Sequence, residues 1–145
     1  MGLKGTLSGH FLEGENDTLF CTDWRYLTPD EKISILTFIK DIDEQTHVIG
    51  KNKESWLDDD RDEILGAEGY KDENYWHYHC GPGWYHNTFR CMTKCLYFNP
   101  GGKASHECIH YYPVPEENGK IVVVGYSRIH IPFLRSDDPR NPFFK

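Results

Sequence analysis

The spacing of apolar residues predicts a helix near the start of the chain. This helix begins after Thr28, whose hydroxyl can cap it, and Glu31 stands three residues later, as in a capping box. Pro29 suits the first helical position, and we expect the helix to end by Gly50. The apolar positions that follow the helical period are Ile33, Ile35, Leu36, Phe38, Ile39 and Ile42.

A second, more acidic helix is predicted over Glu54–Leu65. Its apolar anchors would be Trp56, Leu57, Ile64 and Leu65. Gly66 and Gly69 are expected to stop it.

After Tyr70 the pattern changes to the alternation that is typical of strands. Asn118-Gly119, near the end of this part, is a strong signal for a hairpin turn. Four strands are expected, over Asn74–Cys80, Arg90–Phe98, Glu107–Tyr112 and Ile121–Ile129. This order predicts an α+β fold, with two N-terminal helices packed on one face of a four-stranded, mostly antiparallel sheet.

The same pattern sets the expected domain limits. A single α+β domain would span residues 28–133, after an irregular N-terminal extension over residues 1–27. Residues 134–145 form a tail rich in proline and charge, either a wrap around the domain or a loose end. The length of 145 residues fits one compact domain.

Composition and charge narrow the class of protein. No apolar run approaches the roughly 20 residues that a membrane helix needs, and the N-terminus has no secretory apolar region. We therefore expect a cytoplasmic protein without a membrane partner, and reduced thiols for its five cysteines. The net charge is −7, but residues 73–145 carry six acidic and eight basic side chains and six of the eight histidines. An anionic ligand is therefore expected to meet this second half.

The first candidate constellation is Trp76-His77-Tyr78-His79. Because side chains alternate along a strand, His77 and His79 share one face, and Trp76 and Tyr78 take the helix-covered face. Two histidines on an open sheet face could act as acid, base or phosphate ligands near neutral pH. Ordinary solvated strand histidines are the alternative.

The second constellation depends on the register of the predicted hairpin. A two-residue turn at Asn118-Gly119 would pair Glu107 with His130. One face of the sheet would then carry Glu107, Tyr111, Tyr126, Arg128 and His130. The carboxylate could orient the histidine, and the arginine could hold a phosphate. A surface ion pair is the alternative, and a slip of one residue would bring Cys108 and His110 to this face instead.

The third constellation is a zinc site, which soft ligands at several positions would allow. On a strand, Cys91 and Cys95 would lie about 13 Å apart, too far for one tetrahedral ion unless the chain turns between them. The candidate ligands are Cys91, Cys95, Cys108 and His110, with His77, His79 and His86 in reserve. We expect no cofactor, and zinc stays as the alternative.

The run from Ile121 to Phe133 carries a resemblance to a known family. It reads IVVVGYSRIHIPF, a short apolar stretch, then a glycine, then a histidine followed by an apolar residue. With two helices and four strands before its end, the chain resembles the RelE/ParE superfamily of toxins, in particular mRNA interferases of the YafQ and YafO kinds. Glu107–Tyr112 looks like the penultimate strand of that family.

The resemblance implies a RelE-like fold and an endoribonuclease toxin. In that family the concave face of the sheet binds mRNA, usually in the ribosomal A site, and promotes attack of the ribose 2′-hydroxyl on the phosphate. His130 stands where a catalytic histidine is expected, with Arg128 beside it. The implied partners are RNA, on the ribosome or free, and a cognate antitoxin that covers the same face.

This chemistry needs a base for the 2′-hydroxyl, an acid for the leaving oxygen and a cation for the phosphate. His130 would be one of the two proton-transfer groups, oriented by Glu107, and His77 or His79 the other. The residues expected to bind the substrate are Arg90, Lys94, Tyr111, Tyr126 and Arg128.

A non-catalytic interpretation is the alternative. The acidic run over residues 58–63 could be the working surface of a host- or phage-encoded inhibitor that captures a protein partner, or that imitates nucleic acid. A solvated helix face would explain the same run. A small zinc-stabilised module is the remaining alternative.

Overall fold

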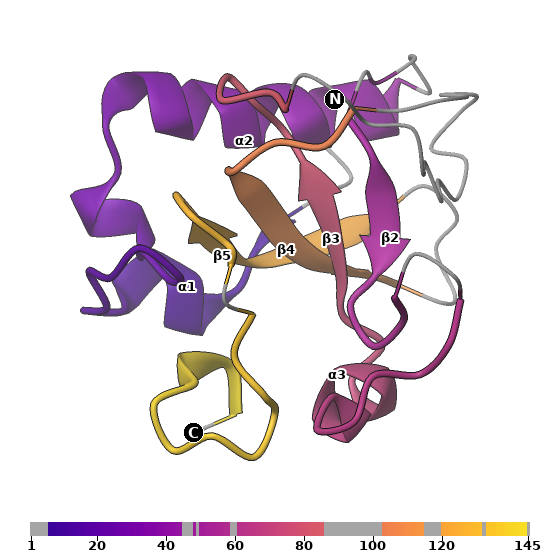
Figure 1. Ribbon diagram of the computed structural model, residues 1–145. Coiled ribbons are helices and arrows are strands. Elements are labelled where there is room, and N and C mark those ends of the chain that lie inside the picture. The colour runs from indigo at the N-terminus through magenta and orange to yellow at the C-terminus, as the bar shows by residue number, and fades with distance from the viewer. Residues whose placement is uncertain are drawn as a thin grey trace.

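A five-stranded sheet organises an α+β fold (Figure 1). The computed structural model describes residues 6–44, 48, 50–58, 61–85, 103–114, 120–131 and 133–144. Strands β2, β3, β4 and β5 are antiparallel neighbours, and β1 pairs in parallel with β5, so the order is β1-β5-β4-β3-β2. The strands are β1 (Thr6–Leu7), β2 (Asn52–Glu54), β3 (Trp76–His79), β4 (Cys108–Pro113) and β5 (Ile121–Ser127). The helices are α1 (Gly9–Glu13), α2 (Pro29–Asp43) and α3 (Glu68–Asp72), with 3-10 turns at Trp24–Tyr26 and Pro142–Phe144.

Helix α2 starts as the sequence predicts. The Glu31 amide donates to the Thr28 hydroxyl at 3.2 Å, and the Thr28 amide donates to the Glu31 carboxylate at 2.8 Å, so the capping box is confirmed. Phe38 stacks on Tyr78 of β3, with ring centroids 4.4 Å apart. This packing joins the helix to the sheet, and the buried residues of α2 are Ile35, Phe38, Ile39 and Ile42.

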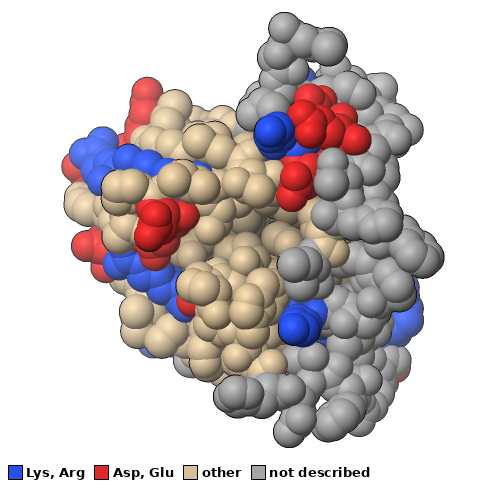
Figure 2. All heavy atoms as spheres, turned by 90° about the horizontal axis from the view of Figure 1, so that it is seen from above, with Lys and Arg blue, Asp and Glu red and all other residues tan. Residues whose placement is uncertain are grey.

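Two of the apolar residues predicted for α2 lie on its outer side and are exposed to solvent. Ile33 is 58% exposed and Leu36 is 43% exposed, because apolar residues surround the helix and only one stripe can face the sheet. Seen from this side, acidic and basic groups lie near one another around an uncharged area in the described part of the surface (Figure 2).

The prediction of a second helix over Glu54–Leu65 is wrong. The start of Glu54–Leu65 belongs to β2, and the described residues beyond it form turns in which Leu57 bridges Glu63. The Asp62 amide donates to the Asp58 side chain at 2.9 Å, a local bond that competes with a helix. The helix that does form is α3, and it contains Gly69, one of the glycines expected to act as stop signals.

The register of β4 and β5 differs from the predicted one. Cys108 pairs with Ser127, Ile109 with Tyr126 and His110 with Gly125, and an irregularity then follows between His110 and Tyr111. The register predicted from a two-residue turn is therefore wrong, and Glu107 does not pair with His130. Three members of the predicted face, Glu107, Tyr126 and Arg128, do line one cavity, but His130 is not among its lining residues. The Asn118-Gly119 turn and the predicted strand Arg90–Phe98 lie outside the described residues.

The C-terminal segment, residues 133–144, wraps over the second face of the sheet (Figure 1, yellow). Phe143 packs against His110, with ring centroids 4.8 Å apart, at the place where Gly125 leaves room for its ring. The Tyr70 hydroxyl donates to the Leu134 carbonyl at 2.7 Å and accepts from Asn141 at 2.7 Å. The sheet is therefore covered on both faces, by α2 on one and by this segment on the other.

The expected N-terminal extension is also part of the fold. Strand β1 continues the sheet, Ser8 caps α1, and Phe11 is fully buried in the main core. The Thr22 amide donates to the Tyr126 carbonyl at 2.9 Å, which attaches the following loop to β5. None of the described helices is long and apolar enough to cross a bilayer.

Candidate metal centre

Four histidines and a cysteine gather beneath the C-terminal segment. The rings of His79 and His130 lie 4.9 Å apart, and those of His77 and His79 lie 5.3 Å apart. The exposed fractions are 5% for His77, 4% for His79, 0% for Cys108, 1% for His110 and 6% for His130. The histidines of β3 share one face, as predicted, but that face is buried rather than open.

The pairing of β3 with β4 creates this cluster. His77 stands directly opposite His110, and His79 stands directly opposite Cys108. Directly opposed residues of antiparallel strands have their Cβ atoms about 4.5–5.5 Å apart on the same face. His130 joins from beyond β5, where its amide donates to the His106 carbonyl at 3.2 Å.

Three of these side chains bring metal-ligand atoms together. One nitrogen of His77, one nitrogen of His79 and the sulfur of Cys108 all lie within 4.8 Å of one another. Around a tetrahedral zinc ion, donor atoms would be about 3.4–3.6 Å apart, given zinc bonds of about 2.0–2.3 Å. Small side-chain rotations would therefore bring the three atoms to a shared ion.

Hydrogen bonds determine which ring nitrogens remain available. His130 Nδ1 lies 2.9 Å from the His106 carbonyl, which can only accept, so this nitrogen holds the proton and Nε2 has the free lone pair. His77 Nδ1 lies 2.9 Å from the Ser55 hydroxyl. His79 Nδ1 lies 2.9 Å from the carbonyl and 3.0 Å from the amide of Ser105, so either tautomer finds a partner. Such second contacts orient histidines that bind metals.

Burial keeps the cluster uncharged. Burial and the neighbouring histidines lower the pKa of His77 well below its usual value. Burial, with His130 nearby, lowers the pKa of His79 to about 3, and burial also lowers that of His130. Burial, together with Cys80 and Glu107, raises the pKa of the Cys108 thiol. The imidazoles are thus in the neutral form that binds metals, and the thiol would lose its proton to solvent as its sulfur bound the ion.

One buried nitrogen of His110 has no hydrogen-bond partner in the part of the chain that the structure describes. The Ser127 hydroxyl donates to the Phe20 carbonyl, so it must accept from His110 Nε2, 2.7 Å away. His110 Nδ1 is therefore unprotonated, and it has no hydrogen-bond partner among the described residues. Burial, with His130 and His79 nearby, lowers the pKa of His110 to about 3.

The other predicted site residues lie apart from these histidines. Glu107 accepts from the Gly83 amide at 2.9 Å and, with Arg128, lines a cavity of about 840 Å³ on the α2 side. Arg128 forms a two-pronged ion pair with Glu31, at 2.8 and 2.9 Å. The predicted orientation of His130 by Glu107 is therefore wrong, because the two residues do not pair, and the Arg128 guanidinium is already bound to a carboxylate.

The two predicted tyrosines are buried in the core, and Tyr126 also lines the cavity that Glu107 and Arg128 line. Tyr126 is 1% exposed, and Tyr111 is 2% exposed and donates to the Asn52 side chain. Five other candidates lie outside the described residues: His86, Arg90, Cys91, Lys94 and Cys95. The sequence does not indicate that Ser55 would contact His77 or that Ser105 would contact His79, because these contacts depend on how β2 and the segment before β4 pack.

No protein-family model, curated protein or solved structure matches this chain. The chemistry of the cluster is therefore the basis on which a function can be proposed.

Proposed function

We propose that the protein binds a zinc ion through His77, His79 and Cys108. The observation that carries the proposal is the meeting of their three donor atoms within 4.8 Å in a buried place. Nitrogen and sulfur donors suit zinc, whereas magnesium and calcium prefer oxygen.

The ion would have a structural role. His130 could supply the fourth ligand, since its ring lies 4.9 Å from that of His79 and its Nε2 has a free lone pair. A closed site with four protein ligands is typical of structural zinc. Such an ion would join β3, β4 and the segment after β5, and the protein would be a zinc-stabilised module.

The test is to measure zinc in the purified full chain and in two cysteine variants. We expect about one zinc ion per chain, lost in Cys108→Ser and kept in Cys80→Ser. Cys80 is a matched control, because it directly follows β3 but lines the cavity on the α2 side. Cobalt substituted for zinc should show sulfur-to-metal charge transfer in the control and not in Cys108→Ser.

Added zinc should also stabilise the metal-free protein. At a free zinc concentration 100 times the dissociation constant, binding adds about 2.7 kcal/mol to the free energy of unfolding. For a chain of this size that corresponds to a rise in melting temperature of roughly 5–11 °C. A chain that stays metal-free and gains no stability from zinc, or zinc that persists in Cys108→Ser, would overturn the proposal.

A second candidate is RNA cleavage by a RelE-like enzyme, with His130 as the general base. It is supported by the Nε2 lone pair of His130, which the hydrogen bond of Nδ1 to the His106 carbonyl leaves unprotonated. The ring of Tyr85 lies 6.5 Å from that of His130 and 4.8 Å from that of the exposed His106. Because Arg128 is paired with Glu31, another cation would have to hold the phosphate.

Induced expression in bacteria distinguishes the two candidates. A ribonuclease should arrest growth with cleaved mRNA, and His130→Ala should abolish both effects. Intact RNA and normal growth with the wild-type chain would refute this second candidate and leave the zinc proposal unaffected.

A further inference from the structure

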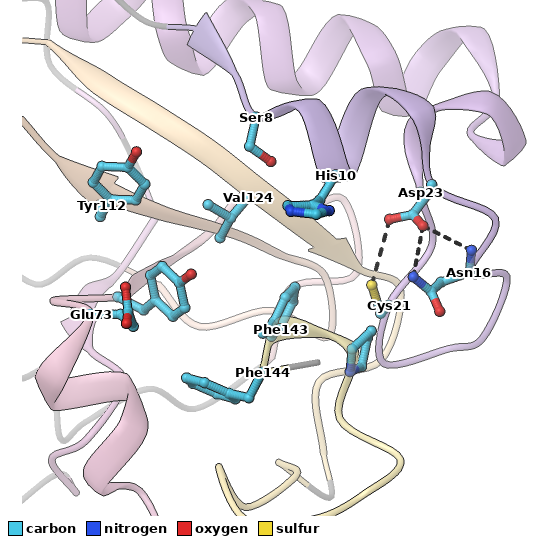
Figure 3. A pocket seen from close by; sticks show the side chains of 13 residues that line it. Ser8, His10, Asn16, Cys21, Asp23, Glu73, Tyr112, Val124, Phe143 and Phe144 are labelled. Atoms are coloured by element: carbon cyan, nitrogen blue, oxygen red, sulfur yellow. Dashed lines mark hydrogen bonds between the residues drawn. The ribbon is translucent and has the colours of Figure 1, made fainter.

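A second cavity lies beside β5, between α1 and the C-terminal segment (Figure 3). Its volume is about 830 Å³, which is enough for a small organic molecule. Phe143 lines this cavity and also covers the histidine cluster, but none of the proposed zinc ligands lines the cavity. A ligand in this cavity would therefore occupy a site separate from the proposed zinc site.

Aromatic rings form one wall of this cavity. The ring of Tyr75 lies 6.1 Å from that of Tyr112, 6.4 Å from that of Phe143 and 5.7 Å from that of Phe144. All four side chains are half-buried, so part of each ring stays accessible. The faces of aromatic rings have negative electrostatic potential and attract organic cations.

A buried carboxylate lies at one end of the cavity. Asp23 is 2% exposed, and its Oδ2 accepts from the amide and the side chain of Asn16, both at 2.8 Å. The hydrogen bond to its Oδ1 is a weak one, from the Cys21 thiol at 3.8 Å. Oδ1 therefore retains room for a strong donor.

The charge of Asp23 has no cationic partner within the described part of the chain. No described lysine or arginine forms an ion pair with it. Gly14 lets the carboxylate approach the backbone of α1, since a Cβ at that position would lie 2.1 Å from Oδ2. A buried charge without a partner is costly, so a cation in the cavity would relieve this cost.

The second acidic residue of the lining is Glu73, which is exposed. Glu73 lies at the opposite end of the cavity from Asp23, with the aromatic side chains between them (Figure 3). The exposed His10 is the one lining residue of basic type, and none of the 13 lining residues is lysine or arginine. The cavity thus combines a carboxylate at each end with an apolar, aromatic middle.

We propose that this cavity binds an aliphatic diamine or polyamine. One ammonium group would donate to Asp23 Oδ1, the methylene chain would lie along the aromatic wall, and a second ammonium group would face Glu73. A quaternary ammonium ion fits less well, because it has no N–H to donate to Oδ1. An inorganic cation would leave the aromatic wall unused.

The experiment titrates 1,4-diaminobutane into the full chain by calorimetry. Tyr112→Leu should weaken binding by up to about tenfold, the loss expected for one cation–π contact. Glu73→Gln should weaken it by roughly two- to fivefold, because Glu73 is exposed and solvent screens its charge. Asp72→Asn is the matched control, since Asp72 is the exposed acidic neighbour of Glu73 and does not line the cavity. It should leave the affinity unchanged.

Two further ligands test the chemistry of the recognition. The uncharged 1,4-butanediol should not bind, and choline should bind more weakly than the diamine. The proposal is overturned if the diamine does not bind, if Asp72→Asn weakens it as much as Glu73→Gln, or if choline binds as well. Glu73 and Tyr112 are not fully buried, so their variants should fold even if Asp23 variants do not.

Discussion

Replacing Gly125 with alanine tests how the C-terminal segment is held on the sheet. A Cβ at this position would lie 2.3 Å from Cε1 and 2.6 Å from Cζ of Phe143. Non-bonded carbon atoms are normally about 3.5–4.0 Å apart, so the ring would have to move by roughly 1 Å or more. Its movement would disturb the contacts with His110, 4.8 Å away, and with Phe20, 5.7 Å away.

The expected cost follows from how this ring is packed. Adding a methyl group to a well-packed site typically costs about 1–3 kcal/mol. Removing a fully buried Phe side chain costs about 3–5 kcal/mol, and Phe143 is half-buried, so complete release of the ring would cost less than that. We expect Gly125→Ala to lower the free energy of unfolding by about 2 kcal/mol and the melting temperature by roughly 4–8 °C.

Urea denaturation of four variants measures this effect: Gly125→Ala, Gly9→Ala, Phe143→Ala and the double variant of Gly125 and Phe143. Gly9→Ala is the control, because a Cβ there meets nothing within 4 Å, and its stability should stay within about 0.5 kcal/mol of the wild type. In a Phe143→Ala background, Gly125→Ala should cost little, because the opposing ring is gone. A wild-type stability for Gly125→Ala, or simple additivity in the double variant, would refute this account of how the segment docks.

Three further predictions concern the histidine cluster, the helix cap and a close backbone contact. With metal removed by a chelator, the free energy of unfolding should fall as the pH drops from about 6.5 towards 3. The slope should be about 1.4 kcal/mol per pH unit for each histidine, because in this range the unfolded chain binds protons that the buried rings do not bind. The lowered pKa of about 3 for His79 and for His110 sets the lower end of this window, and a flat profile in urea denaturation would contradict it. Thr28→Ala should cost about 1 kcal/mol in the same assay while Thr28→Ser costs much less, and equal losses would show that the hydroxyl does not cap α2. Gly50→Ala should be more damaging than Gly125→Ala, because a Cβ there would lie 1.6 Å from the His79 carbonyl oxygen, and equal stabilities would contradict the tight approach of Gly50 to β3.

Part of the fold could be predicted from short sequence patterns whose residues lie close together along the chain. Thr28 and Glu31 predicted the start of α2, because a capping box needs no partner from elsewhere in the chain. The alternation around His77 and His79 predicted a strand with both imidazoles on one face, since side chains of a strand must alternate. The α+β class followed from the order of these signals.

Other features depended on contacts between distant segments. Residues 52–54 pair with β3, so the start of the predicted second helix is a strand. The register of β4 and β5 already differs from that of an ideal two-residue hairpin next to the turn, where Tyr112 pairs with Val122, and the irregularity between His110 and Tyr111 changes it by one residue position. β5 ends at Ser127, so strand alternation does not extend to His130, which lies with the other histidines instead of with Glu107 and Arg128.

The sequence by itself determined the local structure and the supply of soft ligands: a capped helix, alternating strands, and histidine and cysteine at positions that can share a face. The tertiary structure decided that His77 lies opposite His110, that His79 lies opposite Cys108, and that all four are buried under the C-terminal segment. The physical reason is that register and burial arise from packing between segments far apart in the chain. Local preferences decide which way a side chain points along its own strand, but the segments that pack against that face decide whether a histidine meets water, a metal ion or another ring.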